Sequence, residues 1–253
     1  MEDFGNLVYE SKTYNIYRNG KNAYKIFNSS VKKSHVLQEA INQTLAEETS
    51  ISVPKIYQIS PNQNDEWMIS YEFVEGLSLN TLIDKHPEKQ DMYIDYMIKL
   101  QTKIFNENAY SFNSLREKLQ KRINESNLSP QIRCKLLTRL SVLPIQTKLC
   151  HGRFIPNNIV ITKDKLPYVL DWGESTQGNG ASDIANTYLL LRLNYGDDFA
   201  EKYLSKIEQK TEYTIKQVKR WVPIIAASLI NYSEGETQEF YTMCANAIEF
   251  EDK

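Results

Sequence analysis

Alternation of polar and apolar residues in the first third of the chain predicts β-strands. Five short segments are rich in β-branched and aromatic residues, at positions 7–9, 14–17, 23–27, 53–59 and 67–74. Asn19 and Gly20, between the second and third segments, form a dipeptide typical of a tight hairpin turn. We therefore expect an antiparallel sheet of five strands at the N-terminal end.

A helical period of apolar residues replaces this alternation elsewhere. One such helix is predicted at 31–48, between the third and fourth strands, because Val36, Ala40 and Ile41 recur on one face. Seven more are predicted further on, at 88–105, 114–123, 130–140, 181–192, 198–209, 214–230 and 236–249. Pro223 lies inside one of them and predicts a kink or break there.

The change from strand to helix composition predicts two lobes, with a boundary near residue 75. Residues 1–75 would form an N-terminal lobe with five strands and one helix, and residues 76–253 a helical C-terminal lobe. A hairpin at 149–174 interrupts the helical part. Its strand-like runs are followed or preceded by polar residues, with Asn158 just before the first run and Asp171 just after the second.

The geometry of this hairpin brings Asn158 and Asp171 toward each other. An amide oxygen and a carboxylate are hard ligands, of the kind that suits Mg²⁺ carrying the phosphates of a nucleotide. Asp171 is the stronger candidate, since a carboxylate at the end of an apolar strand needs a cation or a cap.

Composition narrows the possible partners. The chain has 253 residues, 41% hydrophobic and 25% charged, which is ordinary for a globular protein able to bury a large core. A net charge of −2 and a pI near 6.0 give no electrostatic case for binding nucleic acid or a membrane, although they leave room for a local basic patch. The longest apolar run, 221–230, is about half as long as a membrane span requires.

Three cysteines occur at spacings that match no zinc motif. An odd number of cysteines favours free thiols in a reducing compartment, so we expect a cytoplasmic protein. No oligomeric state is predicted.

Three segments, taken together and in order, resemble one family. Residues 151–159 read H-G-R-F-I-P-N-N-I, residues 169–172 read V-L-D-W, and residues 178–185 read G-N-G-A-S-D-I-A. They are similar to the H-G-D-x-x-P-x-N-I, I-D-W and G-x-x-x-x-D-L-A patterns of the aminoglycoside phosphotransferase and choline kinase group. The resemblance implies an α+β, two-lobed protein-kinase-like fold, with a small antiparallel-sheet N-lobe and a mainly helical C-lobe.

The resemblance also implies a site for ATP or GTP with Mg²⁺. Lys25 would pair with Glu39 and contact the nucleotide phosphates, and Asn158 and Asp171 would hold the metal ion. In the other interpretation, Lys25 is a solvated strand lysine and Glu39 a solvated helix glutamate.

Two further segments would complete the nucleotide site by resemblance. Ser11 and Thr13 lie in the loop expected to cover the phosphates, and main-chain groups of Glu72, Phe73 and Val74 would contact the adenine. The other interpretation of Phe73 is core packing.

Two residues of the resembling segments would support the loop rather than react. The resemblance makes His151 a structural residue, and it makes Asp183 an aspartate that bonds back to the same loop. A helix N-terminal aspartate is the other interpretation of Asp183. A polycationic acceptor would need carboxylates, which could come from Asp197, Asp198, Glu201, Glu234 and Glu236.

Arg153 departs from the family pattern, which has an aspartate there that accepts the proton of the substrate hydroxyl. Arginine stays protonated and cannot act as that base. Three hypotheses follow. The chain is a pseudokinase that binds a nucleotide or a protein partner; it is a working kinase that uses Glu174, Glu75 or Asp84 as its base while Arg153 clamps an anion; or Arg153 is an introduced substitution.

We therefore predict an ATP- and Mg²⁺-dependent phosphotransferase that acts on the hydroxyl of a small molecule. The alternative is a catalytically impaired pseudokinase that serves as a nucleotide-binding or interaction module. The predicted partners are a nucleotide and a small hydroxyl-bearing substrate, without nucleic acid or membrane.

Overall fold

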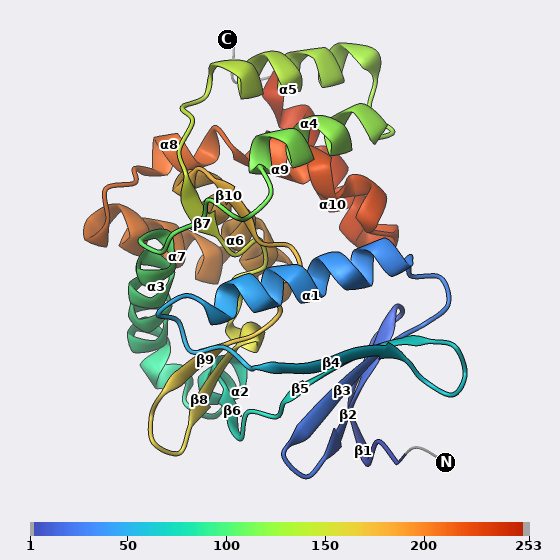
Figure 1. Ribbon diagram of the computed structural model, residues 1–253. Coiled ribbons are helices and arrows are strands. Elements are labelled where there is room, and N and C mark those ends of the chain that lie inside the picture. Colours follow the sequence, from blue (N-terminus) through green and yellow to red (C-terminus); the bar gives the residue numbers. More distant parts are fainter. Residues whose placement is uncertain (1–2, 250–253) are drawn as a thin grey trace. The chain divides into compact units, whose positions relative to one another are not determined.

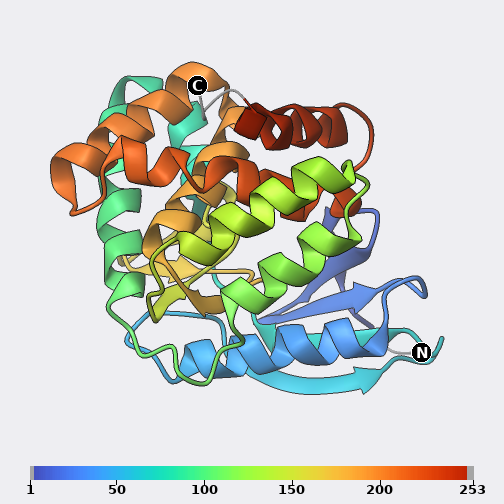
Figure 2. The same cartoon turned by 90° about the horizontal axis from the view of Figure 1, so that it is seen from above.

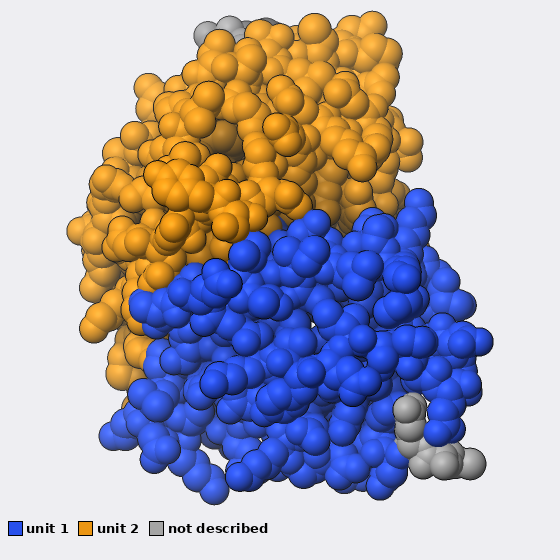
Figure 3. Space-filling model, viewed as in Figure 1, with its two compact units in different colours: residues 1–87, 156–174 blue, residues 88–155, 175–253 orange. Residues whose placement is uncertain are grey.

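The computed structural model describes residues 3–249, which fall into two compact units (Figure 3). The sheet unit consists of Met1–Pro87 and Pro156–Glu174, and the helical unit of Glu88–Ile155 and Ser175–Lys253. These units differ from the division near residue 75 that the sequence suggested. The chain passes to the helical unit only after Pro87, and most of the hairpin at 149–174 belongs to the sheet unit.

The sheet unit contains an antiparallel sheet of five strands in the order β1-β2-β3-β5-β4, which confirms the sequence prediction (Figure 1). The strands are β1 (Asn6–Glu10), β2 (Tyr14–Asn19), β3 (Asn22–Phe27), β4 (Ile56–Pro61) and β5 (Trp67–Glu72). Gly20 has a φ of +60° in the turn between β2 and β3, a conformation that glycine adopts without strain.

Helix α1 (Lys33–Glu47) lies along this sheet and contacts β4 and β5 (Figures 1 and 2). The buried cluster beneath it includes Phe27 of β3, Ile69 of β5, and Val36 and Ala40 of α1. Val36 and Ala40 of the apolar stripe that predicted this helix therefore pack on the sheet, whereas Ile41 of the same stripe is exposed.

The remainder of the sheet unit is built around the predicted hairpin. Strands β8 (Ile159–Thr162) and β9 (Pro167–Val169) form it, and β6 (Gly76–Ser78) adds a third strand beside β8. Helix α2 (Leu79–Lys85) and the short 3-10 helix η2 (Pro156–Asn158) complete the unit. The pairing of β6 with β8 explains why the hairpin groups with the sheet unit.

The helical unit confirms the predicted helices and adds a two-stranded ladder of β7 (Lys148–Cys150) and β10 (Thr176–Gly178). Its helices are α3 (Gln90–Phe105), α4 (Leu115–Glu125), α5 (Pro130–Val142), α6 (Gly180–Tyr195), α7 (Asp197–Lys210), α8 (Ile215–Lys219), α9 (Val222–Leu229) and α10 (Gly235–Asn246), with 3-10 turns η1 (Pro87–Lys89, across the end of the sheet unit), η3 (Ile230–Tyr232) and η4 (Ala247–Glu249). The three-residue strands β7 and β10 were not predicted, because segments this short carry no alternation.

The helix predicted at 214–230 is divided into α8 and α9, as the position of Pro223 indicated. Pro223 lies in the first turn of α9, where its missing N–H leaves no helical bond unmade. Helix α9 carries the longest apolar run and is buried among α4, α6 and α10 (Figure 2). Across residues 3–249, we find no helix with the length and apolar character that crossing a membrane would take.

Candidate functional site

Lys25 is buried on the α1-facing side of strand β3, with 5% of its surface exposed. Its Nζ lies 2.6 Å from Oε1 of Glu39 on α1 and 3.7 Å from Oδ1 of Asp171. The same ammonium lies 3.9 Å from the ring centroid of Tyr14. The structure thus brings Lys25, Glu39 and Asp171 together, and Lys25 is not a solvated strand lysine.

The carboxylates keep Lys25 charged. Burial lowers the pKa of Lys25, but the opposite charges of Glu39 and Asp171 outweigh burial, and the pKa of Lys25 is raised above its ordinary value. Burial raises the pKa of Glu39; Lys25 opposes this, and repulsion from Asp171 and Glu174 adds to it. Two carboxyl groups, those of Glu39 and Asp171, therefore lie beside one ammonium, an arrangement that favours the arrival of another cation.

Asp171 follows β9 in a left-handed conformation, with a φ of +65°. Aspartate tolerates this region better than most residues, and such backbone positions gather at functional sites. Ile159 pairs with Val169, and the amide of Leu170 donates to the carbonyl of Asn158 at 2.8 Å. Asn158 and Asp171 consequently lie at the same end of the hairpin, as the sequence predicted.

Two residues that the sequence analysis did not single out hold the segment after Asp171. The side-chain amide of Asn42 donates to the carbonyl of Gly173 at 2.9 Å. A Cβ atom at Gly173 would lie 3.0 Å from Cγ of Glu39, so a glycine allows the backbone to approach α1 this closely. A polar residue such as Asn42 on the apolar face of a predicted helix is the sequence signal that could have identified this contact.

The loop between β1 and β2 is closed by its own polar groups. The hydroxyl of Ser11 donates to the carbonyl of Tyr14 at 2.8 Å and accepts from the amides of Tyr14 and Thr13 at 3.1 and 3.3 Å. Thr13 itself is exposed. Ser11 therefore shapes the loop, whereas Thr13 presents its side chain at the surface.

The segment after β5 makes main-chain bonds within the sheet unit. The amide of Glu72 donates to the carbonyl of Lys55, and the amide of Phe73 to the carbonyl of Lys21, both at 2.8 Å. The half-buried ring of Phe73 packs under the guanidinium of Arg18, 4.1 Å away, so its environment is not the apolar core.

Two of the carboxylates considered as replacement bases have partners. Glu75 forms an ion pair with Arg18. Asp84 is exposed on α2 and accepts a hydrogen bond from Asn80 at 3.1 Å. Glu174, the third, is the one whose charge acts on Glu39.

In the helical unit, the loop after β7 has a rigid backbone. His151 is fully buried; its Nδ1 accepts from the amide of Arg153 at 3.2 Å, and its carbonyl accepts from the hydroxyl of Ser175 at 3.1 Å. Gly152 has a φ of +78°, which a residue with a side chain rarely adopts. The supporting role expected for His151 is confirmed.

Asp183 fixes the same loop from helix α6. Its Oδ1 accepts from the amide of Gly152 at 2.7 Å, and its Oδ2 accepts from the side-chain amide of Gln101 at 3.0 Å. The hydroxyl of Tyr203 donates to Oε1 of Gln101 at 2.5 Å. Asp183 therefore bonds back to the loop, as the resemblance implied. No pattern in the sequence predicted the part that Gln101 has in this buried network.

Asn186 completes the support of the loop, since its side-chain amide donates to the carbonyl of Gly152 at 2.5 Å. The side chain of Arg153 is exposed. Burial raises the pKa of Tyr241 on α10 to about 12, and the positive charge of Arg153 opposes that rise. A fixed backbone thus presents a cation where the family pattern has a base.

Some carboxylates considered for a polycation pocket already have partners in the helical unit. Asp197 lies 2.6 Å from Nε of Arg192. Glu201 accepts from the hydroxyl of Tyr188 at 2.5 Å and lies 3.6 Å from Nζ of Lys219. These two side chains are therefore partly neutralised.

The sequence and the fold are similar to those of known phosphotransferases. The model of the phosphotransferase enzyme family matches residues 13–214. A thermostable mutant of aminoglycoside phosphotransferase APH(4)-Ia has a similar structure, with a TM-score of 0.71 at 10% identity over 96% of this chain and 92% of that chain. Choline kinase LicA from Streptococcus pneumoniae has a similar structure, with a TM-score of 0.66 at 15% identity over 97% of this chain and 92% of that chain.

Aminoglycoside 2'-phosphotransferase-IIIa, in a complex with GDP, gives a TM-score of 0.62 at 12% identity over 98% of this chain and 93% of that chain. No curated protein sequence matches the chain significantly. At these identities the solved structures establish a shared protein-kinase-like fold. The match to the family model extends over most of the sequence, and the chain therefore belongs to the phosphotransferase enzyme family.

Proposed function

We propose that this protein transfers a phosphoryl group from ATP or GTP to a hydroxyl of a small molecule. The observation that carries the proposal is the buried ammonium of Lys25 between the carboxylates of Glu39 and Asp171. A buried charged group is costly unless it is paired, and hydrophobic residues would fill the same space at least as stably. A phosphate-binding role gives a reason for this arrangement.

Mg²⁺ fits the residues at the end of the hairpin. Asn158 and Asp171 offer hard oxygens, and the excess of carboxylate charge around Lys25 favours a divalent cation. Within residues 3–249 no group of three or more His, Cys, Asp or Glu could hold a metal ion. Magnesium commonly takes one or two protein ligands and completes its shell with phosphates and water, where it neutralises phosphate charge.

For the nucleotide, we propose main-chain contacts near Glu72, Phe73 and Val74. The amides of Glu72 and Phe73 are already donated, so among these three described residues the amide of Val74 is the donor that remains for an adenine. Thr13 is the better hydroxyl for the phosphates, because Ser11 is occupied in shaping its loop. Related structures contain GDP, AMP or AMP-PNP, which supports a nucleotide here.

Arg153 limits what the helical unit contributes. The hydrogen bonds that His151 and Asp183 accept from loop amides fix the loop, but a guanidinium cannot take the proton of an acceptor hydroxyl. Positioning and charge neutralisation remain, and the missing base corresponds to a loss of about 10²- to 10⁴-fold in rate. The same observation favours a second candidate function, a protein that binds nucleotide without turnover.

We propose a neutral or anionic alcohol as the acceptor. Asp197 and Glu201 have partners, and Arg153 adds a positive charge, so these residues are poorly suited to a polycation such as an aminoglycoside. All three cysteines are free, which fits a reaction in the reducing cytoplasm.

Calorimetry with ATP, with and without Mg²⁺, tests the nucleotide site. We expect binding that Mg²⁺ tightens, and loss of this binding in Lys25→Met. Lys163→Ala, which removes an exposed lysine of the hairpin turn, is the matched control and should bind normally. Absence of binding in the unaltered chain would refute the proposal. Phosphate release over a panel of alcohols then separates the two candidate functions, because the non-catalytic protein gives no turnover above background.

A further inference from the structure

A hollow of about 700 Å³ lies in the helical unit between α5, α8 and η4. Nine residues line it, and five are lysine or arginine while none is acidic: Lys135, Arg139, Lys216, Lys219 and Arg220. We call this the basic groove. It is made only of residues of the helical unit, whereas Lys25 and Asp171 belong to the sheet unit.

The charge of the groove contrasts with that of the whole chain, which has a net charge of −2. No Asp or Glu occurs at 126–163, the region that contains α5, or at 213–233, the region that contains α8. All five cations of the basic groove therefore come from two regions without acidic residues. Charge segregation of this kind concentrates positive potential.

The helical period places these cations on common faces. Lys135 and Arg139 are four residues apart on α5, and Lys216, Lys219 and Arg220 fall within four residues on and just after α8. Cations at the ends of helices can serve the helix dipole, which accounts for Lys219 and Arg220. That explanation also covers Lys216, since α8 has only five residues, but it does not reach Lys135 in the middle of α5.

Partners offset the charge of the groove in part: Glu201 lies 3.6 Å from Nζ of Lys219, and Lys135 and Arg139 also have interaction partners. Like charges gathered on facing helices repel one another and lower stability. An anion bound in the groove relieves this repulsion.

The other lining residues indicate the size and kind of ligand. Val142, with 68% of its surface exposed, and Ile248 supply apolar walls, and Thr138 supplies a hydroxyl. The volume falls within the roughly 300–1,000 Å³ typical of small-molecule sites. No aromatic residue lines the groove, so it lacks the stacking surface that single-stranded nucleic acid requires.

Taken together, the geometry points to a site for a small molecule that bears two or more phosphate groups, distinct from the proposed nucleotide site around Lys25. Lysines act as point-charge donors to phosphate and arginine as a bidentate donor, so a groove with both suits a short polyphosphate chain. The phosphates could belong to a nucleoside polyphosphate or to inorganic polyphosphate.

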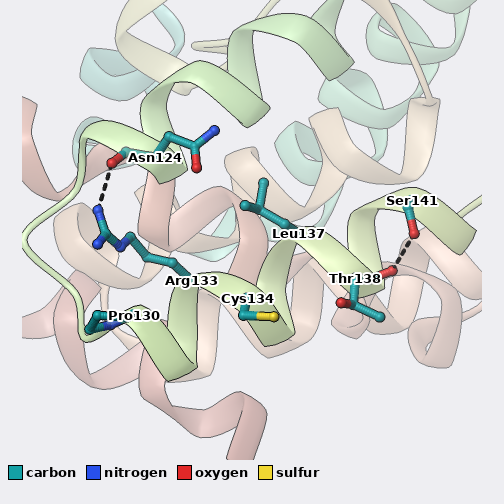
Figure 4. Close-up of a pocket in the computed structure, with 7 residues that line it drawn as sticks. All are labelled: Asn124, Pro130, Arg133, Cys134, Leu137, Thr138 and Ser141. Atoms are coloured by element: carbon teal, nitrogen blue, oxygen red, sulfur yellow. Dashed lines mark hydrogen bonds between the residues drawn. The ribbon is translucent and has the colours of Figure 1, made fainter.

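Cys134 provides a built-in probe of this groove. It lines the groove and also a second hollow of about 520 Å³ on the same helix, where Arg133 donates to the carbonyl of Asn124 (Figure 4). Of the three cysteines, Cys134 is exposed whereas Cys150 and Cys244 are buried. A disulfide reagent therefore reports on Cys134 first, by forming a mixed disulfide and releasing one aromatic thiolate.

The experiment measures the rate at which the native protein reacts with 4,4'-dithiodipyridine, a neutral reagent, in EDTA. We expect tripolyphosphate at about 1 mM to slow the reaction by about fivefold or more. Sodium chloride of equal ionic strength should not slow it. Protection should disappear in the double variant Lys135→Ser/Lys216→Ser and persist in the matched variant Lys99→Ser, which removes an exposed lysine of α3.

Two further measurements complete the test. One distinguishes a nucleoside polyphosphate from inorganic polyphosphate, and the other distinguishes the basic groove from the proposed nucleotide site around Lys25. ATP that protects as well as tripolyphosphate identifies the phosphates as the recognised part, while stronger protection by ATP identifies a nucleoside polyphosphate. Lys25→Met should abolish Mg²⁺-ATP binding by calorimetry and leave the protection of Cys134 by tripolyphosphate unchanged. The inference would be overturned if tripolyphosphate slowed the reaction of Cys134 no more than sodium chloride does. It would also be overturned if Lys99→Ser lost the protection to the same extent as the double variant Lys135→Ser/Lys216→Ser.

Discussion

Replacing Lys25 by methionine tests the electrostatic reasoning about the sheet unit most directly. The change keeps the length and apolar stem of the side chain but leaves Glu39 and Asp171 without their ammonium partner. Removing one partner of a buried ion pair costs about 3–5 kcal/mol. The side chains of Glu39 and Asp171 are 22% and 21% exposed, so water and proton uptake relieve part of this, and we expect about 2–3 kcal/mol.

A loss of this size lowers the Tm of a protein of this length by about 4–12 °C. The double variant Lys25→Met/Glu39→Gln should recover most of the loss, because it removes the unpaired buried carboxylate at the same time. Urea unfolding of the native protein, both single variants and the double variant gives the coupling free energy between the two sites.

The single variant Lys25→Met should also depend on pH in a defined direction. Burial and neighbouring carboxylates raise the pKa of Glu39, and removing Lys25 raises it further. The unfolded-state pKa of a glutamate is about 4.3. A carboxyl whose folded-state pKa lies above this value binds more protons in the folded state than in the unfolded state. It therefore destabilises the folded state increasingly as the pH rises from the unfolded-state pKa to the folded-state pKa. The loss of unfolding free energy caused by Lys25→Met should therefore become smaller as the pH is lowered from 7 to about 5. A deficit independent of pH, or a double variant no more stable than the single one, would refute the reasoning.

Three other changes probe the proposed roles of individual residues. Arg153→Asp should raise phosphate release with a suitable alcohol by about 10²- to 10⁴-fold, whereas Arg153→Lys should not, and equal turnover in both would contradict the missing-base argument. Gln101→Leu removes the hydrogen bond that Gln101 donates to Oδ2 of Asp183. It should lower the free energy of unfolding, measured in urea, by about 1–3 kcal/mol, and an unchanged value would show that the network does not contribute to stability. Gly173→Ala places a methyl group 3.0 Å from Cγ of Glu39, so it should weaken the Mg²⁺-ATP thermal shift more than it lowers the Tm of the free protein, and an unaltered shift would argue against the close approach.

The combination of a preserved sheet-unit site and an altered loop has a physical consequence. In the function proposed above, the contacts of Lys25 and Asp171 would serve nucleotide binding, whereas Arg153 stands at the position that would serve proton transfer. Binding and turnover can therefore be lost independently, and a change at Arg153 should alter turnover while the affinity for nucleotide stays close to that of the native protein.

The sequence by itself determined the elements of this protein. Alternation and helical period are local properties, so they predicted the five strands, the helix beneath them, and the break before α9 at Pro223. The order of the motif segments was sufficient to suggest the family. The strands β6, β7 and β10 were missed because three residues carry no period, and their pairing depends on distant partners.

Only the tertiary structure decided which side chains meet. Asn42 bonds to Gly173 across 131 residues, and Gln101 bonds to Asp183 across 82. The gathering of cations from α5 and α8 around one groove has the same origin. Such contacts depend on how separate elements pack, and packing is set by the whole core rather than by the residues on either side of a position.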